Sequence, residues 1–537
     1  MNMKKIYLTV ISLGITGMLQ AQDTYLNERM INSGSELYGT SRYVGMGGSM
    51  GALGADLSCM SYNPAGIGLY RRSDISMTAG AQWNTHHAPD LKNSRGTFDQ
   101  IGCVITTRTN SEEHPYLSIG VNFQKKINFG QSFIADNSNL KGLSQMDQLA
   151  DMANGGFGTN YNITGAAIDY QFLTPELDQN GNQVTNNNGT KQYFNKFNGE
   201  ESYYSQHQWG GLNTFDVNIS GNYNDRIYWG VTAGFESLKY HSETDYYEKS
   251  SITEDGQLKY GDYSLYNNTL VDGWGFNMKF GLIARPIEDS PLRLGVAFET
   301  PTWYQLTAST LNQLYDEIDQ IGYNGVAGQM DESYLEYSLR NPAKGRFSIG
   351  SSVSNYLLWN IDYEIANYKY MNMGYPKSYS YDGSASLFNN EPDRAMNQLT
   401  KNMLGFQHSL RAGIEVKPTT RTAVRLGYNY SSSPYKDNVS FDQYSIDSYA
   451  MDYMTRTSYW RVGDAHTITL GLGYRAKHFY IDMAYKVRGQ KADFYAFDDT
   501  FNQENPIITN NGTPVSLDPV EVNLGRQNFT CTLGFKF

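Results

Sequence analysis

The sequence predicts an all-β protein: a fourteen-stranded antiparallel transmembrane β-barrel with an N-terminal segment folded inside its lumen. Three observations predict this fold: the composition, a recurring alternation of apolar and polar residues, and an alternation of long and short connections. Hydrophobic residues are only 40% and charged residues 18% of the 537 residues, below the ~45–50% and ~25% usual in soluble domains. Aromatic residues nevertheless reach 14%, led by 43 Tyr, whereas disordered chains lack them.

Residues 1–21 have the pattern of a secretory signal peptide. Lys4 and Lys5 give a positive start, residues 6–19 are apolar but short for a spanning helix, and Ala21 offers a small residue for cleavage. An N-terminal membrane anchor is the alternative. Cleavage would leave 40 basic residues against the 54 acidic ones, a net charge near −14. An acidic exported chain is a poor binder of nucleic acid.

Strands are predicted wherever apolar and polar residues alternate strictly, because alternate side chains of a strand point to opposite faces. The clearest case is the end of the chain, where Phe529, Cys531, Leu533, Phe535 and Phe537 alternate with polar or small residues. Fourteen such segments are found, and single-chain bacterial barrels have an even number of strands. They are 75–84, 99–108, 116–125, 215–220, 226–239, 274–282, 291–301, 345–353, 357–371, 406–417, 421–432, 465–476, 478–490 and 529–537.

Long and short connections alternate between these segments. The longest is the insertion 126–212, which is followed by a turn of two residues, Asn224 and Asp225. A spanning barrel needs this alternation, with tight turns at the periplasmic rim and large loops outside the cell. In lipid every backbone polar group must be paired, so a polar sequence can span only as a closed barrel. Residues 73–537 are therefore predicted to form the barrel, located in an outer membrane.

Residues 22–72 lack strand alternation and are predicted to form a plug, or hatch, inside the barrel. The stretch 39–54 is rich in glycine, and Asn63-Pro64-Ala65-Gly66 follows it. The glycines do not match the spacing of a phosphate-binding loop. Close packing of backbone against the barrel wall is the better interpretation.

Asn63-Pro64-Ala65-Gly66, preceded by a Gly/Ala-rich segment and Asp56, resembles the hatch of the long-chain fatty-acid outer-membrane transporter family (FadL type). Three other features of the sequence also fit this family. They are Gly275-Phe276-Asn277 to Arg285-Pro286, Leu292 to Gly295 with Thr300-Pro301-Thr302, and the ending on Phe537, which is similar to the signature that barrel-assembly machinery reads.

The resemblance implies passive uptake of hydrophobic small molecules, such as long-chain fatty acids or hydrocarbons, with lateral release into outer-membrane lipid. It assigns Asn63, Pro64, Ala65 and Gly66 to the gate. A kinked third strand would provide the exit, and Gly120 is the candidate for the kink because it is the strand's only glycine. By the same resemblance, Gln22 and Asp23 would reach into the lumen pocket. A rigid turn that merely fills the lumen is the alternative for the gate motif.

The insertion 126–212 contains one predicted helix. Leu143, Met146, Leu149 and Met152 recur at helical spacing, after a possible capping box of Ser144 and Asp147. An exposed Leu/Met stripe over the barrel mouth could capture apolar ligands, since thioethers adapt to varied shapes. Packing between loops is an equal alternative.

Other chemistry is weakly indicated, and no cofactor, metal or enzymatic activity is predicted. The three cysteines, Cys59, Cys103 and Cys531, give neither a disulfide framework nor a metal spacing. His86-His87 leave a haem or metal role open, while 178–182 lacks the closing Glu of a calcium loop. A lipase with Ser and His on the barrel wall, and an adhesion barrel with large extracellular loops, remain alternatives. The ligand, the direction of flux and the oligomeric state are not determined by the sequence.

Overall fold

The computed structural model describes most of the chain after the predicted signal peptide. The described residues are 36–85, 94–155, 163–254, 257–288, 290–316, 328–329, 333–354, 356–376, 390–436, 456–497 and 515–537. The signal peptide, Gln22, Asp23 and His86-His87 lie outside them. Within the described residues, no helix is long and apolar enough to cross a membrane.

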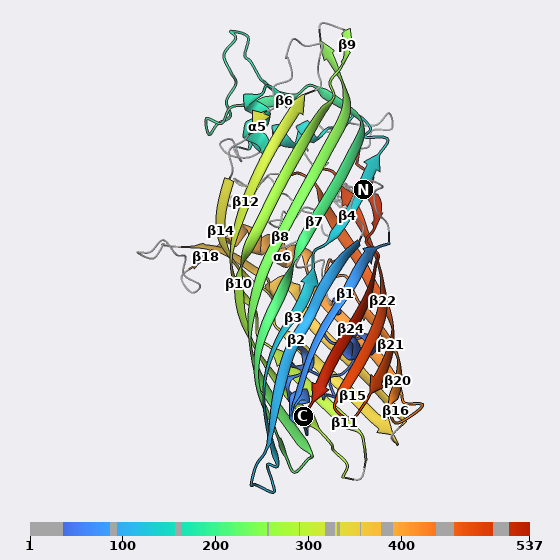
Figure 1. The fold of residues 1–537 in the computed structure, drawn as a ribbon. Coiled ribbons are helices and arrows are strands. Elements are labelled where there is room, and N and C mark those ends of the chain that lie inside the picture. The colour runs from blue at the N-terminus through green and yellow to red at the C-terminus, as the bar shows by residue number, and fades with distance from the viewer. Residues whose placement is uncertain are drawn as a thin grey trace, which may run out of the picture.

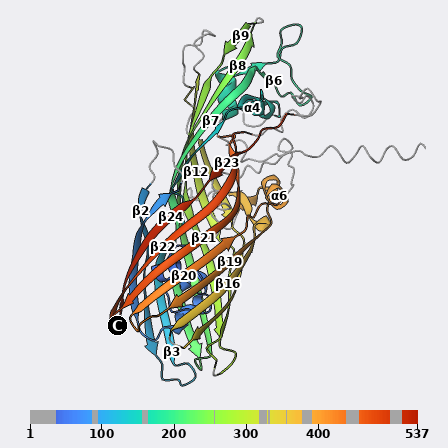
Figure 2. The same ribbon diagram turned by 90° about the vertical axis from the view of Figure 1, so that its right-hand side faces the viewer.

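The described strands form one closed antiparallel barrel with fourteen wall positions (Figures 1 and 2). The ring closes where β24 pairs with β1, from Lys536↔Asp74 to Arg526↔Asn84. The wall strands in order are β1 (Asp74–Asn84), β2 (Ser94–Arg108), β3 (Tyr116–Asn128), β7 (Phe197–Tyr223), β8 (Ile227–Glu254), β10 (Tyr263–Ala284), β11 (Arg293–Glu299) with β12 (Trp303–Asp316), β14 (Ser333–Arg340) with β15 (Lys344–Val353), β16 (Leu357–Asn367), β19 (Phe406–Val416), β20 (Thr422–Ser431), β21 (Tyr459–Arg475), β22 (Phe479–Tyr495) and β24 (Arg526–Lys536).

The predicted fourteen-stranded barrel is confirmed, and each predicted strand corresponds to one wall position. The outer and inner faces of the wall differ as the alternation predicts. Ile119, Leu426 and Leu472 are 53%, 53% and 60% exposed on the outside, while Thr78 and Thr469 are fully buried toward the lumen. A closed barrel has no unpaired edge, and an apolar outer band of this kind is the lipid-facing surface of an outer-membrane barrel.

Some wall strands are much longer than a membrane requires. β7 and β8 have 27 and 28 residues, against the ~9–11 that span a bilayer, so their upper parts project beyond the barrel mouth (Figure 1). At the other rim they join through the predicted turn, where Asn224 and Asp225 have φ of 50° and 51°. Positive φ at both positions is the type I′ hairpin geometry.

The remaining elements lie in the hatch and in the connections between wall strands. The hatch contains α2 (Ser41–Gly45), α3 (Cys59–Tyr62) and the 3₁₀ helix η1 (Pro64–Leu69). The connections contain β4 (Gln131–Asn137), α4 (Gln145–Asn154), α5 (Ile163–Asp169), β5 (Leu173–Pro175), β6 (Tyr193–Asn195), β9 (Gln257–Tyr260), β13 (Gly328–Gln329), η2 (Tyr368–Tyr370), β17 (Asn372–Pro376), β18 (Asn390–Pro392), α6 (Arg394–Met403) and β23 (Val520–Asn523).

Candidate functional site: the hatch and the lumen above it

The hatch, described from residue 36, fills the lower lumen of the barrel. Its segments contact inward-facing residues on opposite sides of the wall: the Ser41 amide donates to Thr532 of β24, at 2.7 Å, and the Met50 amide to Asp362 of β16, at 3.0 Å. Arg42 pairs with Glu415 of β19 at 3.1 Å. These contacts hold the hatch from several sides, as a plug requires.

Asn63, Pro64, Ala65 and Gly66 lie together and are buried. Asn63 caps η1, since its Oδ1 accepts from the Ala65 amide at 3.2 Å, and its Nδ2 donates to the Gly51 carbonyl at 2.7 Å. The Pro64 carbonyl accepts from Ser220 of β7 at 2.9 Å. The motif is thus a rigid turn that docks on the wall; whether it acts as a gate stays a proposal.

Glycines on the lumen face of the wall make room for the hatch. A Cβ built on Gly230 of β8 would overlap the Pro64 carbonyl, and one on Gly281 of β10 would overlap the Asn63 side chain. The same close approach recurs around the ring. It involves Gly295 with Gly51, Gly413 with Met46, Gly427 with Gly47, and Gly471 with Gly45.

The predicted kink of the third strand at Gly120 stays a prediction, and the pairing around this residue is regular. Gly120 pairs without interruption with Val104 of β2 and Asn218 of β7. The register irregularity in β3 falls between Lys125 and Ile127 instead. Gly120 leaves room for the Met60 side chain of the hatch, whose end a Cβ there would overlap.

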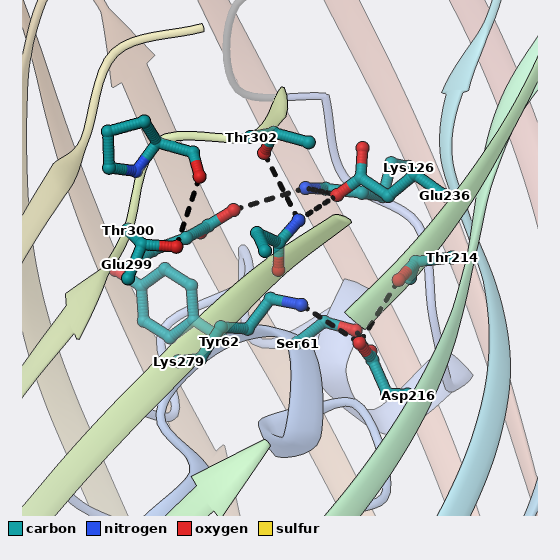
Figure 3. A network of polar contacts seen from close by, with 12 residues as sticks. Ser61, Tyr62, Lys126, Thr214, Asp216, Glu236, Lys279, Glu299, Thr300 and Thr302 are labelled. Carbon is teal, nitrogen blue, oxygen red and sulfur yellow. Dashed lines mark hydrogen bonds and ion pairs between the residues drawn. The ribbon is translucent and has the colours of Figure 1, made fainter. Parts of the chain in front are cut away.

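A network of buried charges lies where the upper side of the hatch meets the wall (Figure 3). Asp216 of β7 accepts from Lys279 of β10 at 2.8 Å, both side chains being fully buried, and also from Ser61 of the hatch. Lys126 bridges Glu236 and Glu299, at 2.7 and 3.3 Å. Since a buried charge is costly unless paired, these pairs fix the arrangement of the wall around the hatch.

Two arginines of the wall clamp one tyrosine of the hatch. The Arg346 and Arg411 guanidinium carbons lie 4.7 and 4.5 Å from the centre of the Tyr62 ring. Arg346 also donates to the Tyr62 carbonyl, at 3.0 Å, and pairs with Glu299 and Glu364, at 2.6 and 2.5 Å. Cation–π contact between desolvated groups stabilises by about 2 kcal/mol or more, so Tyr62 is firmly held in this arrangement.

A cavity of about 90 Å³ lies directly above this clamp, with room for several water molecules. Its charged lining sets the cationic groups of Lys125, Lys126, Lys344, Arg346 and Arg411 against the carboxylates of Glu36, Glu299 and Glu364. Its apolar lining is made of Ile127, Leu212, Tyr304 and Tyr368. Among the described residues, Lys344 forms no ion pair. The cavity is therefore amphipathic, with an excess of positive charge on its charged side.

The apolar side of the cavity belongs to a larger group, the mid-lumen cluster. Its members are Ile127, Phe129, Leu212, Leu238, Tyr240, Val271, Tyr304, Leu306, Ala308, Leu335, Tyr337, Leu339, Ala366, Tyr368, Met371, Met373, Met396, Leu399, Met403 and Leu404. Met396, Leu399 and Met403 come from α6, a helix that was not predicted from the sequence. Two signals could have revealed α6: the spacing of these three residues, and Asp393 before them, which caps the Met396 amide at 2.9 Å.

The predicted helix after Ser144 is confirmed, but the stripe on it is not exposed. Leu143, Met146, Leu149 and Met152 are 2%, 0%, 0% and 1% exposed. They pack inside a second buried group, the cap cluster, which also includes Phe133, Ile163, Phe172, Phe197 and Tyr263. This cluster joins α4 and α5 to the projecting strands. Ser144 and Asp147 form the predicted capping box. The loop-packing alternative describes this arrangement, and a role of these residues in ligand capture stays a proposal.

The helix α4 is anchored to the projecting sheet by a buried carboxylate. Glu248 of β8 accepts from the Ser144 hydroxyl at 2.5 Å, the Gln145 amide at 3.1 Å and Tyr246 at 2.6 Å. Desolvation by burial raises the pKa of Glu248, opposed by these hydrogen bonds. The same cause raises the pKa of Asp147 to about 7.

One Ser–His pair tests the lipase alternative. Ser132 and His207 Nδ1 lie 2.6 Å apart, and His207 Nε2 lies 3.0 Å from an Arg95 guanidinium nitrogen. Because arginine can only donate, Nε2 must accept and the proton sits on Nδ1. His207 then cannot take a proton from Ser132, so this pair lacks a general base. No three metal-ligating side chains cluster in the part of the chain that is described.

The fold and the filled lumen define the class of this protein: an outer-membrane β-barrel whose lower lumen is occupied by the N-terminal residues described from 36 to 72. No family model and no curated protein matches the sequence. Solved structures do match. A Pseudomonas aeruginosa FadL homologue is 12% identical and covers 94% of this chain and 100% of its own, with a TM-score of 0.49.

Two further similar structures are described as toluene transporters. TbuX of Ralstonia pickettii is 14% identical, covers 95% of this chain and 100% of its own, and has a TM-score of 0.45. TodX of Pseudomonas putida is 11% identical, covers 94% of this chain and 98% of its own, and has a TM-score of 0.43.

Proposed function

We propose that this protein is a passive outer-membrane channel for hydrophobic compounds that carry an anionic head group, such as long-chain fatty acids. The observation that carries the proposal is the amphipathic cavity above the hatch. Its charged side offers Lys344 and Arg411 to a carboxylate, and its apolar side continues into the mid-lumen cluster.

The electrostatics of the cavity favour an anion. Lys344 has no ion-pair partner among the described residues, and Arg411 Nε is buried without a hydrogen-bond partner in the same part of the chain. Leaving a buried donor unsatisfied costs about 1–3 kcal/mol. A bound carboxylate would supply the missing acceptor. The hydrogen bond from Arg411 would then orient the head group, in addition to the attraction of the positive charges.

The alkyl chain would lie along the mid-lumen cluster. A cavity of about 90 Å³ accommodates a head group and a few carbons, so the rest of the chain must displace side chains. Met371, Met373, Met396 and Met403 border this route, and methionine is the side chain that rearranges most readily around varied apolar shapes. Captured ligand would then leave sideways into the membrane once the hatch around Asn63 and Pro64 rearranges.

Binding of two lipids that differ only in the head group tests the proposal. Purified protein should bind radiolabelled oleate more tightly than oleyl alcohol, and Lys344→Met should remove most of that preference. Lys491→Met is the matched control, because Lys491 is 67% exposed and pairs with Glu521, and neither residue lines the cavity. Equal binding of oleate and oleyl alcohol by the unaltered protein would contradict an anionic ligand, and no binding of either would contradict uptake.

An adhesion function is a second candidate, and the projecting parts of β7 and β8 favour it. These strands carry a sheet far beyond the lipid band, more than a channel mouth requires. Removing the projection should abolish attachment of cells to a surface while leaving oleate binding intact if adhesion is the function. Loss of oleate uptake with unchanged attachment would favour transport.

A further inference from the structure

Two neighbouring wall strands are interrupted at the same height. In the seventh wall position β11 ends at Glu299 and β12 begins at Trp303. In the eighth, β14 ends at Arg340 and β15 begins at Lys344. Every other wall position is a single continuous strand across the lipid band of the described residues.

The two interruptions face each other, and each contains a proline. Below the gap Glu299 pairs with Lys344, and above it Trp303 pairs with Arg340. This common register places Pro301 opposite Pro342. Proline has no N–H and cannot donate to a ladder, so in sheets it is confined to edges and bulges. Neither of these two residues can therefore donate a backbone hydrogen bond to the wall.

Few backbone bonds cross the gap. Three residue pairs lie in the gap: 300 with 343, 301 with 342, and 302 with 341. Among the described residues, one backbone hydrogen bond outside the ladders joins any of these pairs: the Asn341 amide donates to the Thr302 carbonyl at 3.0 Å. The Pro301 carbonyl is turned to the Thr300 hydroxyl of its own strand, at 3.0 Å. On either side of the gap the same two wall positions pair continuously, so the seam between Pro301 and Pro342 is a weak line between them.

The seam separates the amphipathic cavity from lipid. Thr302, Asn341 and Pro342 line the cavity, together with Glu299 and Lys344 at the lower end of the gap. On the outside, the neighbouring lipid-facing rings of Phe298 and Phe347 are 48% and 55% exposed. The seam thus has the charged lining of the cavity on its inner side and the lipid band on its outer side. Figure 3 shows Thr300, Thr302 and Glu299 beside the network.

We propose that the seam between Pro301 and Pro342 is the lateral exit through which an amphiphile leaves the cavity for the outer membrane. The proposal rests on the proposed uptake function and specifies its route. Opening here breaks one backbone hydrogen bond rather than a ladder. The exit lies between the seventh and eighth wall strands, and the third strand, continuous at Gly120, remains closed.

A reversible covalent staple tests the exit. Thr302→Cys with Asn341→Cys places two lumen-facing thiols opposite each other across the seam. Oxidation should abolish uptake of radiolabelled oleate by cells, reduction should restore it, and binding of oleate to the purified protein should persist in both states. The matched control is Thr307→Cys with Glu336→Cys, a pair in register on the same strands above the seam and outside the mid-lumen cluster, whose oxidation should leave uptake unchanged.

The outcomes separate the exit from the function. Uptake that continues after the seam is oxidised would overturn the proposed exit. The third and fourth wall strands can be stapled instead through Ile119→Cys with Ile219→Cys, which are also in register. Loss of uptake in that variant would likewise overturn the proposed exit. Absence of oleate binding by the unaltered protein overturns the proposed function itself. A variant that keeps the fold without a staple, Pro301→Val with Pro342→Val, restores both donors and should slow uptake without reducing oleate binding.

Discussion

The Ser220 hydroxyl donates to the Pro64 carbonyl across 2.9 Å, and this bond joins the fourth wall strand to the centre of the hatch motif. Both groups are buried. The hatch is thus held by its own backbone against the wall, at a place where Gly230 leaves no side chain in the way.

Gly230→Val should displace the hatch. Its Cβ would overlap the Pro64 carbonyl and approach Ser220 Oγ at 2.5 Å, and overpacking costs about 1–3 kcal/mol. Thermal unfolding in detergent should move to lower temperature, and single-channel conductance in planar bilayers should rise. Gly489→Val is the control, because nothing lies within 4 Å of a Cβ there. Equal behaviour of the two variants would argue against tight docking.

Asn63→Ala should loosen the hatch turn. It removes the cap on the Ala65 amide and the bond to the Gly51 carbonyl, and losing a cap costs about 0.5–2 kcal/mol. If the motif is a gate, the rate of oleate uptake should change while the affinity for oleate stays constant. Thr40→Ala, which removes the cap of α2 on the Tyr43 amide, should leave that rate unchanged. A constant rate in both variants would favour a turn that merely fills the lumen.

Lys279→Met should destabilise the barrel strongly. The Lys279 and Asp216 side chains are fully buried, 2.8 Å apart, and removing one partner of a buried pair costs about 3–5 kcal/mol because the other charge is left unpaired. The double variant with Asp216→Leu should recover much of this loss. The midpoint of heat-induced unfolding on gels measures both, and a double variant less stable than Lys279→Met would contradict the pairing.

Replacing Leu143, Met146 and Leu149 together with Ser should unfold the cap rather than only weaken ligand capture. Each side chain is buried, and truncating a buried Leu or Met costs about 2–5 kcal/mol. Protease added to intact cells should cut the insertion early, while the barrel keeps its unfolding temperature. Leu177→Ser in the same insertion, 59% exposed, is the control. A protected insertion with reduced oleate binding would instead favour the capture role.

Acidic conditions should stabilise the cap. Desolvation by burial raises the pKa of Asp147 to about 7, against ~3.9 in unfolded chains. Between these two pH values Asp147 keeps its proton in the folded cap and loses it in the unfolded chain. The contribution of Asp147 to the free energy of unfolding is therefore complete below about pH 4 and is lost as the pH rises through about 7. Urea titrations at several pH values, followed by a dye on Leu177→Cys, measure this. Asp147→Asn should flatten the dependence, leaving the contribution of Glu248, whose pKa is also raised.

Much of the candidate site could be expected from local sequence. Asn63 to Gly66 stood out as a turn because Asn, Pro and Gly have strong backbone preferences, and the capping box of Ser144 and Asp147 depends on residues three apart. The charged network could not be predicted. Asp216 and Lys279 occupy ordinary polar positions of two alternating strands, and the register between those strands decides that they meet.

The sequence by itself determined the barrel, its fourteen strands and its turns, because alternation and turn chemistry act over a few neighbouring residues. Only the tertiary structure decided what the lumen contains and where its wall is weak. Gly120, a candidate kink from sequence, is a packing site for Met60 because the hatch reaches it. Pro301 and Pro342 became a seam because the register between two neighbouring wall positions set them opposite each other, a relationship between residues 41 positions apart that no local pattern encodes.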